Sequence, residues 1–202
     1  MKKELYGLVV CGGQSSRMGT DKSLIDYHGK PQRYYVYEML EWICDKVFIS
    51  CNSTQASSII APYATLTDLP QYENVGPMAA LLTAFNYYPH HDFLIAGCDY
   101  PYVTTKDLKE FFRSIDQEKP ASAFYNQENE MYEPLLAWYS HKSKNEIQRM
   151  YSNNEFSLQH FLKENEAGKY QPLRPKNLIS VDTPEDYQIA KDSITRKSHF
   201  KP

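Results

Sequence analysis

The order of apolar runs and helix-like segments constrains the fold of this chain most strongly. Seven short apolar runs predict strands, at residues 5–10, 46–51, 64–67, 93–97, 121–125, 134–139 and 178–181. Six longer segments predict helices, at residues 31–44, 77–88, 104–116, 142–152, 157–165 and 184–195. Two neighbouring parallel strands need a crossover connection, and a helix usually supplies it. The sequence therefore predicts an α/β fold with a mostly parallel sheet and helices on both faces.

One region departs from this alternation. Between residues 119 and 141 two predicted strands are joined by the polar segment Asn126–Glu130. This pattern predicts that the two strands form a hairpin or make the sheet mixed. The length of 202 residues fits one sizeable core, so we expect residues 1–202 to form a single domain. Residues 196–202 are polar and basic, and we expect this tail to be frayed.

Two predicted helices begin with favourable capping residues. Thr104 stands three residues before Asp107, which is the spacing of a capping box. Thr183 precedes Pro184 and two acidic residues. Thr183 is therefore placed to cap the helix, the proline takes the first helical position, and negative charge lies in the first turn.

Charge and cysteine content exclude several classes of protein. The net charge of −3 argues against a broad electrostatic grip on nucleic acid, so any anion binding must be local. The four cysteines, Cys11, Cys44, Cys51 and Cys98, form no C-x-x-C pair and no zinc spacing with histidine. We find no signal peptide and no run of about 18 apolar residues. We therefore expect a reduced, cytoplasmic protein that binds neither nucleic acid nor membrane.

Residues 9–23, VVCGGQSSRMGTDKS, place three of the chain's eight glycines and two basic residues directly after an apolar run. A glycine loop that leaves a strand can aim backbone N–H groups at a phosphate, and Arg17 and Lys22 add positive charge. The spacing matches neither the P-loop G-x-x-x-x-G-K-[ST] nor the dinucleotide G-x-G-x-x-G. The residues alone leave two interpretations open, a phosphate-binding loop or a glycine-rich turn with surface charges.

Two acidic residues follow predicted strands. Asp99 ends the run FLIAGCD, and Asp182 ends the run LISVD just before a predicted helix. In an open α/β sheet ligands bind at the carboxyl ends of the strands, and a carboxylate there can hold a hard cation such as Mg²⁺. Each aspartate alone is also typical of an ordinary turn. Two carboxylates at strand ends, together with the basic glycine loop, favour a nucleotide and metal site.

Four motifs of the chain resemble those of a known family. Residues 12–22, GGQSSRMGTDK, are similar to the loop L-A-G-G-x-S-x-R-M-G-x-D-K of the MobA-like NTP transferases, and in particular of the molybdenum cofactor guanylyltransferases. Residues 76–81, GPMAAL, are similar to the G-P-L-A-G-L of that family. Residues 98–101, CDYP, and 182–186, DTPED, are similar to its C-D-x-P and N-T-P-E-E/D motifs. The resemblance spans essentially the whole chain.

The resemblance implies a three-layer, Rossmann-like nucleotidyltransferase fold, with GTP and molybdopterin as substrates and Mg²⁺ as the metal. It implies transfer of GMP to the phosphate of molybdopterin, and transient contact with other cofactor-assembly proteins. By position it assigns nucleotide contacts to Gly12, Gly13, Ser15, Gly19, Lys22, Asp68, Gly76 and Asp99. The catalytic residues would be Arg17, Lys22 and Asp99, and the metal ligands would be Asp99 and Asp182.

Three positions differ from the family's motifs. Cys11 replaces an alanine, Ala80 replaces a glycine, and Asp182 replaces an asparagine that is common in the guanylyltransferases. An aspartate at the last position is familiar in related cytidylyltransferases and sugar-phosphate nucleotidyltransferases. Both of these activities, and a non-catalytic nucleotide-binding module, therefore remain alternatives. A partner-binding scaffold within a cofactor-assembly complex is a further one.

The acceptor side has few specific signals. Tyr132, Trp138 and Gln159 lie where the family carries its acceptor elements, and they could line a pterin pocket. For the two aromatic residues, packing in a core or at a dimer face is the favoured interpretation.

Overall fold

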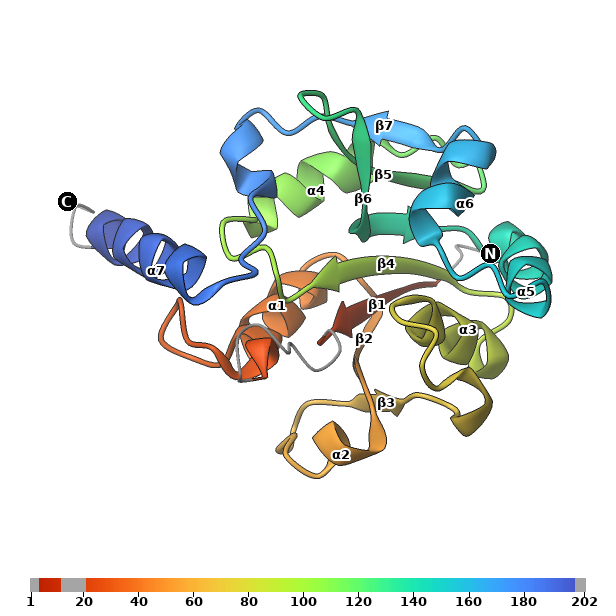
Figure 1. The fold of residues 1–202 in the computed structure, drawn as a ribbon, viewed down its shortest axis with the longest axis horizontal. Helices are drawn as coiled ribbons and strands as arrows, with labels where there is room; N and C mark the ends of the chain where they lie inside the picture. Colours follow the sequence, from red (N-terminus) through yellow and green to blue (C-terminus); the bar gives the residue numbers. More distant parts are fainter. Residues whose placement is uncertain (1–3, 12–20, 199–202) are drawn as a thin grey trace.

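The computed structural model describes residues 4–11 and 21–198, and in these residues seven strands form one sheet of order β3-β2-β1-β4-β6-β5-β7 (Figure 1). The strands are β1 Leu5–Val10, β2 Lys46–Cys51, β3 Thr65–Thr67, β4 Asp92–Gly97, β5 Ala121–Asn126, β6 Met131–Tyr139 and β7 Gly168–Tyr170. β1 pairs in parallel with β2 and β4, β2 with β3, and β5 with β7, whereas β6 runs antiparallel to both β4 and β5. This arrangement confirms the mostly parallel sheet.

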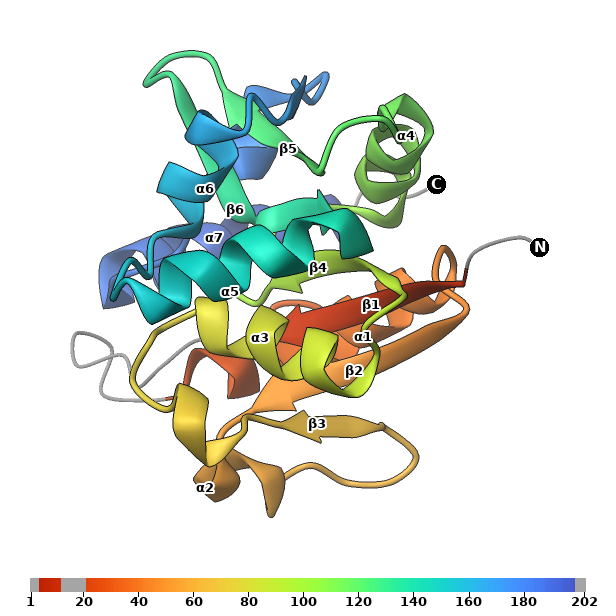
Figure 2. The same cartoon turned by 90° about the vertical axis from the view of Figure 1, so that its right-hand side faces the viewer.

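Helices cover both faces of the sheet (Figure 2). They are α1 Gln32–Glu41, α2 Ser53–Ala56, α3 Met78–Tyr87, α4 Thr105–Ser114, α5 Lys144–Ser152, α6 Leu158–Glu164 and α7 Pro184–Ser198. One buried core joins alternate residues of β1, including Leu8, to α3, α5 and α6. The other joins the remaining residues of β1, including Val9, to α1 and α4. The expected three-layer α/β architecture is therefore confirmed.

β1 lies at the centre of both cores, and all six of its residues are buried. A strand that is covered on both faces is apolar throughout rather than alternating, which explains why the run LYGLVV is so continuous. Gly7 is needed at this position for space. A Cβ atom there would lie 3.2 Å from Cys44 Sγ, Leu40 Cβ and Val47 Cγ2, so the glycine lets α1 pack close against the sheet.

The hairpin predicted between residues 119 and 141 is confirmed, since β5 and β6 are antiparallel neighbours. The strand predicted at 178–181 is wrong. A 3₁₀ helix, η4 (Pro175–Leu178), and an irregular segment occupy this region, and the edge of the sheet is taken by β7. Leu178 and Val181 are apolar because they are buried in packing contacts, which a pattern of apolar residues does not distinguish from strand pairing. β7 has three residues, too few to produce a sequence pattern.

The segment 178–181 nevertheless reaches the sheet. The backbone N–H of Val181 donates to the carbonyl of Asp99 at 2.9 Å, just beyond the end of β4. α7 then begins at Pro184 and continues to Ser198, so residues 196–198 of the expected tail are helical, while residues 199–202 lie outside the described residues. In the described part of the chain, no helix combines the length and apolar character needed to cross a bilayer.

The capping box predicted at Thr104 is present, and the helix cap predicted at Thr183 is also a capping box. Thr104 Oγ1 accepts from the N–H of Asp107 at 3.2 Å, and Asp107 Oδ2 accepts from the N–H of Thr104 at 2.9 Å. Thr183 and Asp186 exchange the same pair of hydrogen bonds, at 3.2 and 3.0 Å. Asp107 Oδ2 also accepts from Asn177 Nδ2 at 2.9 Å, in a buried contact that ties η4 to α4. This carboxylate therefore holds the segment that leads to Asp182.

We predict that Asp107→Ala lowers the free energy of unfolding by about 2–3 kcal/mol, because it removes a helix cap and leaves the buried amide of Asn177 without this partner. Chemical denaturation of the purified variant measures the loss. Lys106→Ala on the same helix, where the side chain is 77% exposed, is the control and should change stability by less than about 0.5 kcal/mol. Equal stability of the two variants would contradict the tie between η4 and α4.

Candidate functional site

The carboxyl ends of the three central parallel strands lie at one edge of the sheet. Val10 of β1 is in register with Ser50 of β2 and with Gly97 of β4, so the residues that follow these strands emerge side by side. The chain leaves β1 into the glycine loop and leaves β4 into Asp99. Gly12, Gly13, Ser15, Arg17 and Gly19 lie outside the described residues, and their predicted roles stay predictions.

Lys22, Asp99 and Asp182 are brought together at this edge. Lys22 opens a 3₁₀ helix, η1 (Lys22–Leu24), and its Nζ atom lies 2.5 Å from Asp182 Oδ1. The Lys22 side chain is 12% exposed, against 49% for Asp182. The prediction that Asp182 ends a strand is wrong. The hydrogen bond from the backbone N–H of Val181 to the carbonyl of Asp99 places Asp182 beside Asp99 instead. The predicted cluster therefore forms, although one of its residues reaches it by a different route.

Asp99 has the properties of a cation ligand. Its Oδ1 atom is buried and has no hydrogen-bond partner among the described residues, an uncommon and costly arrangement for a carboxylate. Burial raises the pKa of Asp99, the Lys22 ammonium opposes this shift, and the Asp182 carboxylate adds to it. A metal ion would satisfy the orphaned oxygen and offset the repulsion between the two carboxylates.

The number of candidate ligands limits which metal site is possible. The described residues contain no group of three or more His, Cys, Asp or Glu side chains that could enclose a metal ion. Asp99 and Asp182 would therefore supply at most two protein carboxylates. Mg²⁺ is commonly held in this way, by one or two carboxylates together with water and substrate phosphates. The residues present fit Mg²⁺ held jointly with a nucleotide.

A cavity of about 440 Å³ lies at the same edge of the sheet, bounded by the ends of β1 and β2, by α2 and by the start of α3. Asp68 and Gly76, which were predicted as nucleotide contacts, both line it. Gly76 has φ +62°, a left-handed conformation that glycine adopts without strain. Ser50 Oγ donates to Asp68 Oδ1 at 3.1 Å, but burial dominates and raises the pKa of Asp68 to about 6. The cavity thus offers a half-buried carboxylate to a ligand.

A second carboxylate near Asp99 was not found from the sequence. Glu133 lies at the start of β6, and its Oε2 atom accepts from the hydroxyl of Tyr100 at 2.7 Å. Burial raises the pKa of Glu133, while the Tyr100 hydrogen bond lowers it. Only the pairing of β6 with β4 brings Glu133 to the residue after Asp99, and no local pattern signals that pairing.

Two of the three acceptor-side candidates, Trp138 and Tyr132, are buried. Trp138 is 2% exposed and lies in the core with α1 and α4. Tyr132 is 6% exposed, and its hydroxyl donates to the carbonyl of Ala167 at 2.9 Å. Trp138 therefore follows the core interpretation, whereas Tyr132 also lines a cavity of about 570 Å³, and its predicted role stays a prediction. Gln159 is half-buried and lies beside the backbone of Tyr132.

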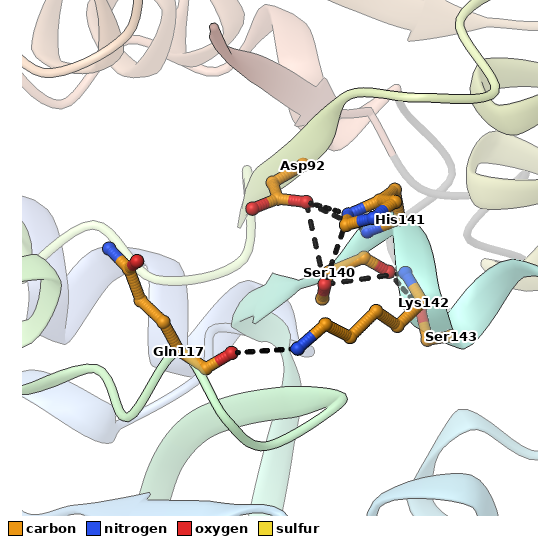
Figure 3. A network of polar contacts seen from close by, with 6 residues as sticks. All are labelled: Asp92, Gln117, Ser140, His141, Lys142 and Ser143. Atoms are coloured by element: carbon orange, nitrogen blue, oxygen red, sulfur yellow. Dashed lines mark hydrogen bonds and ion pairs between the residues drawn. The ribbon is translucent and has the colours of Figure 1, made fainter. Parts of the chain in front are cut away.

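A serine, a histidine and an aspartate meet at the opposite end of β4 (Figure 3). Asp92 Oδ1 lies 2.7 Å from His141 Nδ1, and Ser140 Oγ lies 3.3 Å from the same ring nitrogen. A hydrolase triad needs the serine and the acid on different nitrogens of the histidine, and it needs an accessible serine. Here Ser140 is 2% exposed, and Asp92 also accepts from the His141 backbone N–H at 2.8 Å. The group anchors the turn after β6 and is not a nucleophilic site.

The fold and the charged edge of this sheet are typical of α/β proteins whose ligands bind at the carboxyl ends of the strands. The model of the MobA-like NTP transferase domain matches residues 7–169. The chain belongs to that family, which confirms the expected nucleotidyltransferase class.

Named relatives are similar over most of the chain. It is 33% identical over 187 residues to a molybdenum cofactor biosynthesis bifunctional protein of Synechocystis, covering 91% of this chain and 52% of the relative. The chain thus spans about half the length of that protein. It is 27% identical to a probable molybdenum cofactor guanylyltransferase of Natronomonas pharaonis, covering 95% of this chain and 99% of the relative.

Solved structures share the fold. Molybdopterin-guanine dinucleotide biosynthesis protein A from Archaeoglobus fulgidus superposes with a TM-score of 0.77 at 21% identity, covering 95% of this chain and 99% of that one. A CMP:2-keto-3-deoxy-manno-octonic acid synthetase complexed with CTP gives 0.75 at 13% identity, covering 96% and 99%. These likenesses confirm the nucleotidyltransferase fold.

We predict that Asp68→Asn stabilises the free protein near neutral pH. A carboxyl whose folded pKa is raised to about 6 favours folding below its unfolded pKa, and this contribution is lost as the pH rises through 6. Asparagine does not titrate and can still accept from Ser50. The difference in melting temperature between variant and wild type should therefore grow from pH 5 to pH 7.5. The exposed Asp116→Asn is the control, and a pH-independent difference for Asp68→Asn would contradict the shift.

Proposed function

We propose that this chain transfers GMP from GTP to the terminal phosphate of molybdopterin and releases pyrophosphate. The observation that carries the proposal is the cluster of Lys22, Asp99 and Asp182 at the same edge of the sheet as a 440 Å³ cavity lined by Asp68 and Gly76. Membership of the MobA-like NTP transferase family and the names of its relatives support it. The expected cytoplasmic location and transient contact with other cofactor-assembly proteins belong to the same proposal.

The reaction needs charge neutralisation more than proton transfer. The nucleophile is a phosphate oxygen that is already ionised near neutral pH, so no general base is required. In agreement with this, no histidine lines the cavity in the described part of the chain. Two anions must meet, and a pyrophosphate must leave. Positioned cations and carboxylate-held metal are the usual means by which proteins achieve this.

Asp99 and Asp182 are the residues that would hold Mg²⁺. When bound, Mg²⁺ would offset the negative charge of the phosphates and polarise a phosphoryl oxygen. Lys22 lies against Asp182, which fixes its ammonium group at the edge where the phosphates must lie. Lys22, together with Arg17 and the loop N–H groups of Gly12, Gly13, Ser15 and Gly19, would bind the triphosphate and stabilise the leaving pyrophosphate.

Asp68 would read the base. A carboxylate can accept two parallel hydrogen bonds from the ring N–H and the exocyclic amino group of guanine, an arrangement that cytosine does not offer. Gly76 leaves the cavity wall without a side chain next to the ligand. This chemistry favours GTP, while Asp182 in place of asparagine keeps a cytidylyltransferase as the second candidate.

We predict that Asp99→Asn lowers the rate of pyrophosphate release about 10²–10³-fold at saturating Mg²⁺, because the variant keeps the size of the side chain but loses the charge that holds the metal. The fold should persist, and its melting profile is the control. The rate is measured with GTP, molybdopterin and Mg²⁺. A rate within about threefold of the wild type would show that the metal is held elsewhere.

We also predict that GTP is used at least tenfold better than CTP, which corresponds to a difference of only about 1.4 kcal/mol. Turnover with each of the four nucleoside triphosphates in the presence of Mg²⁺ measures this preference. Equal or better turnover with CTP would assign the chain to the cytidylyltransferases and would leave the reaction class unchanged.

A further inference from the structure

The side-chain amide of Gln55 connects the wall of the cavity lined by Asp68 and Gly76 to the segment that carries Lys22. Gln55 lies on α2, a helix of four residues, none of which is buried. α2 is therefore held by hydrogen bonds and not by core packing. Asn52, Ser53, Thr54 and Gln55 all line the cavity, so the position of α2 sets the shape of that wall.

Both ends of the Gln55 amide are used. Its Oε1 atom accepts from the backbone N–H of Asn52 at 3.2 Å, and this bond is half of the capping box at the start of α2. Its Nε2 atom donates to Asp21 Oδ2 at 2.9 Å, across 34 residues of sequence. The amide thus connects the end of β2 to the segment that carries Lys22.

Asp21 uses both of its carboxylate oxygens as well. While Oδ2 accepts from Gln55, Oδ1 accepts from the backbone N–H of Ser23 at 2.9 Å and caps η1. Lys22 is the first residue of η1, so the carboxylate of Asp21 sets the direction in which the chain presents Lys22. A continuous chain of hydrogen bonds therefore runs from Asn52 through Gln55 and Asp21 to the helix of Lys22.

We propose that Gln55 is a positioning residue, which holds Lys22 in register with the wall of the nucleotide cavity through Asp21. This inference rests on the proposed use of a nucleoside triphosphate. Lys22 would then bind the β- and γ-phosphates well only when the cavity wall formed by α2 is correctly placed. A nucleotide that has only an α-phosphate would not contact Lys22, so its affinity should not depend on the hydrogen bond between Gln55 and Asp21.

In the hydrogen bond between these two side chains, Gln55 is the donor and Asp21 is the acceptor, and a pair of substitutions can exchange these roles. Gln55→Glu replaces the donor by a carboxylate facing Asp21, and two carboxylates repel. Asp21→Asn places an amide donor against the Gln55 donor, or, if it turns, gives up the acceptor for Ser23. In the double variant the new amide at position 21 donates to the new carboxylate at position 55. That carboxylate still accepts from the backbone of Asn52, and the amide oxygen at position 21 still accepts from Ser23. All three hydrogen bonds are then restored, and only the bond between positions 21 and 55 has its donor and acceptor exchanged.

The experiment measures GTP and GMP affinity by calorimetry, and turnover with GTP, for the wild type, both single variants and the double variant. We expect each single variant to weaken GTP binding and to lower kcat/KM about tenfold or more, with GMP affinity nearly unchanged. The double variant should return to within about threefold of the wild type. Gln188→Glu and Asp192→Asn are the matched controls, since Gln188 Nε2 donates to Asp192 Oδ1 at the same 2.9 Å on exposed α7.

Three results would overturn the inference. One is an unchanged ratio of GTP to GMP affinity in both single variants. Another is a parallel loss of GTP and GMP binding with a lowered melting temperature, which would make Gln55 a structural support of α2 only. The third is a double variant no better than the worse single variant. If the wild type binds GTP but does not transfer GMP, the proposed function fails and the binding comparison still decides the role of Gln55. If it binds no triphosphate, both fail.

Discussion

The in-register pairing of β1 with β2 and β4 is the constraint on which the rest of the structure depends. It brings the ends of three strands to a single edge, and it does so only because β1 can be buried on both faces. Gly7 allows α1 to approach that strand closely. Of the described residues of the candidate site, Asp99 is attached to this edge directly, and the segment before Asp182 is attached by a hydrogen bond to it.

The electrostatics of the site oppose the stability of the free protein. Burial raises the pKa of Asp68, Asp99 and Glu133, so ionised carboxylates in these positions cost folding free energy. Lys22 compensates for part of this cost at Asp99. Groups with such perturbed pKa values cluster at functional sites because binding a ligand, and not folding, makes use of them. The carboxylates of this edge therefore point to ligand binding more strongly than their sequence motifs alone.

The sequence was sufficient to predict most elements of the fold. Buried strands such as β1 produce continuous apolar runs, and the capping residues Thr104 and Thr183 mark helix starts directly. The false strand at 178–181 arose because burial by packing and burial by pairing select the same residue types. Within the candidate site, Lys22, Gly76 and Asp99 belong to local motifs and Asp68 follows a predicted strand, and their roles remain predictions.

Gln55 and Glu133 could not be predicted in this way. Each contributes through a partner distant in sequence, Asp21 for Gln55 and Tyr100 for Glu133, and neither belongs to a motif. Their importance comes from which strands are neighbours, β2 beside β1 and β6 beside β4. A single sequence contains the pattern of burial along the chain but only weak information about such pairings.

The small cluster of Tyr27, Val181 and Ala190 has a thermodynamic consequence. It is separate from the two cores on the faces of the sheet, and it joins the segment after η1 to α7. Lys22 and Asp182 form their ion pair beside it. Regions held by few apolar contacts can open while the rest of a protein stays folded. Any open fraction of this unit removes two charges of the site at once, and it lowers the apparent affinity for a ligand in the same proportion. A ligand that contacted both charges would therefore also stabilise this unit against opening.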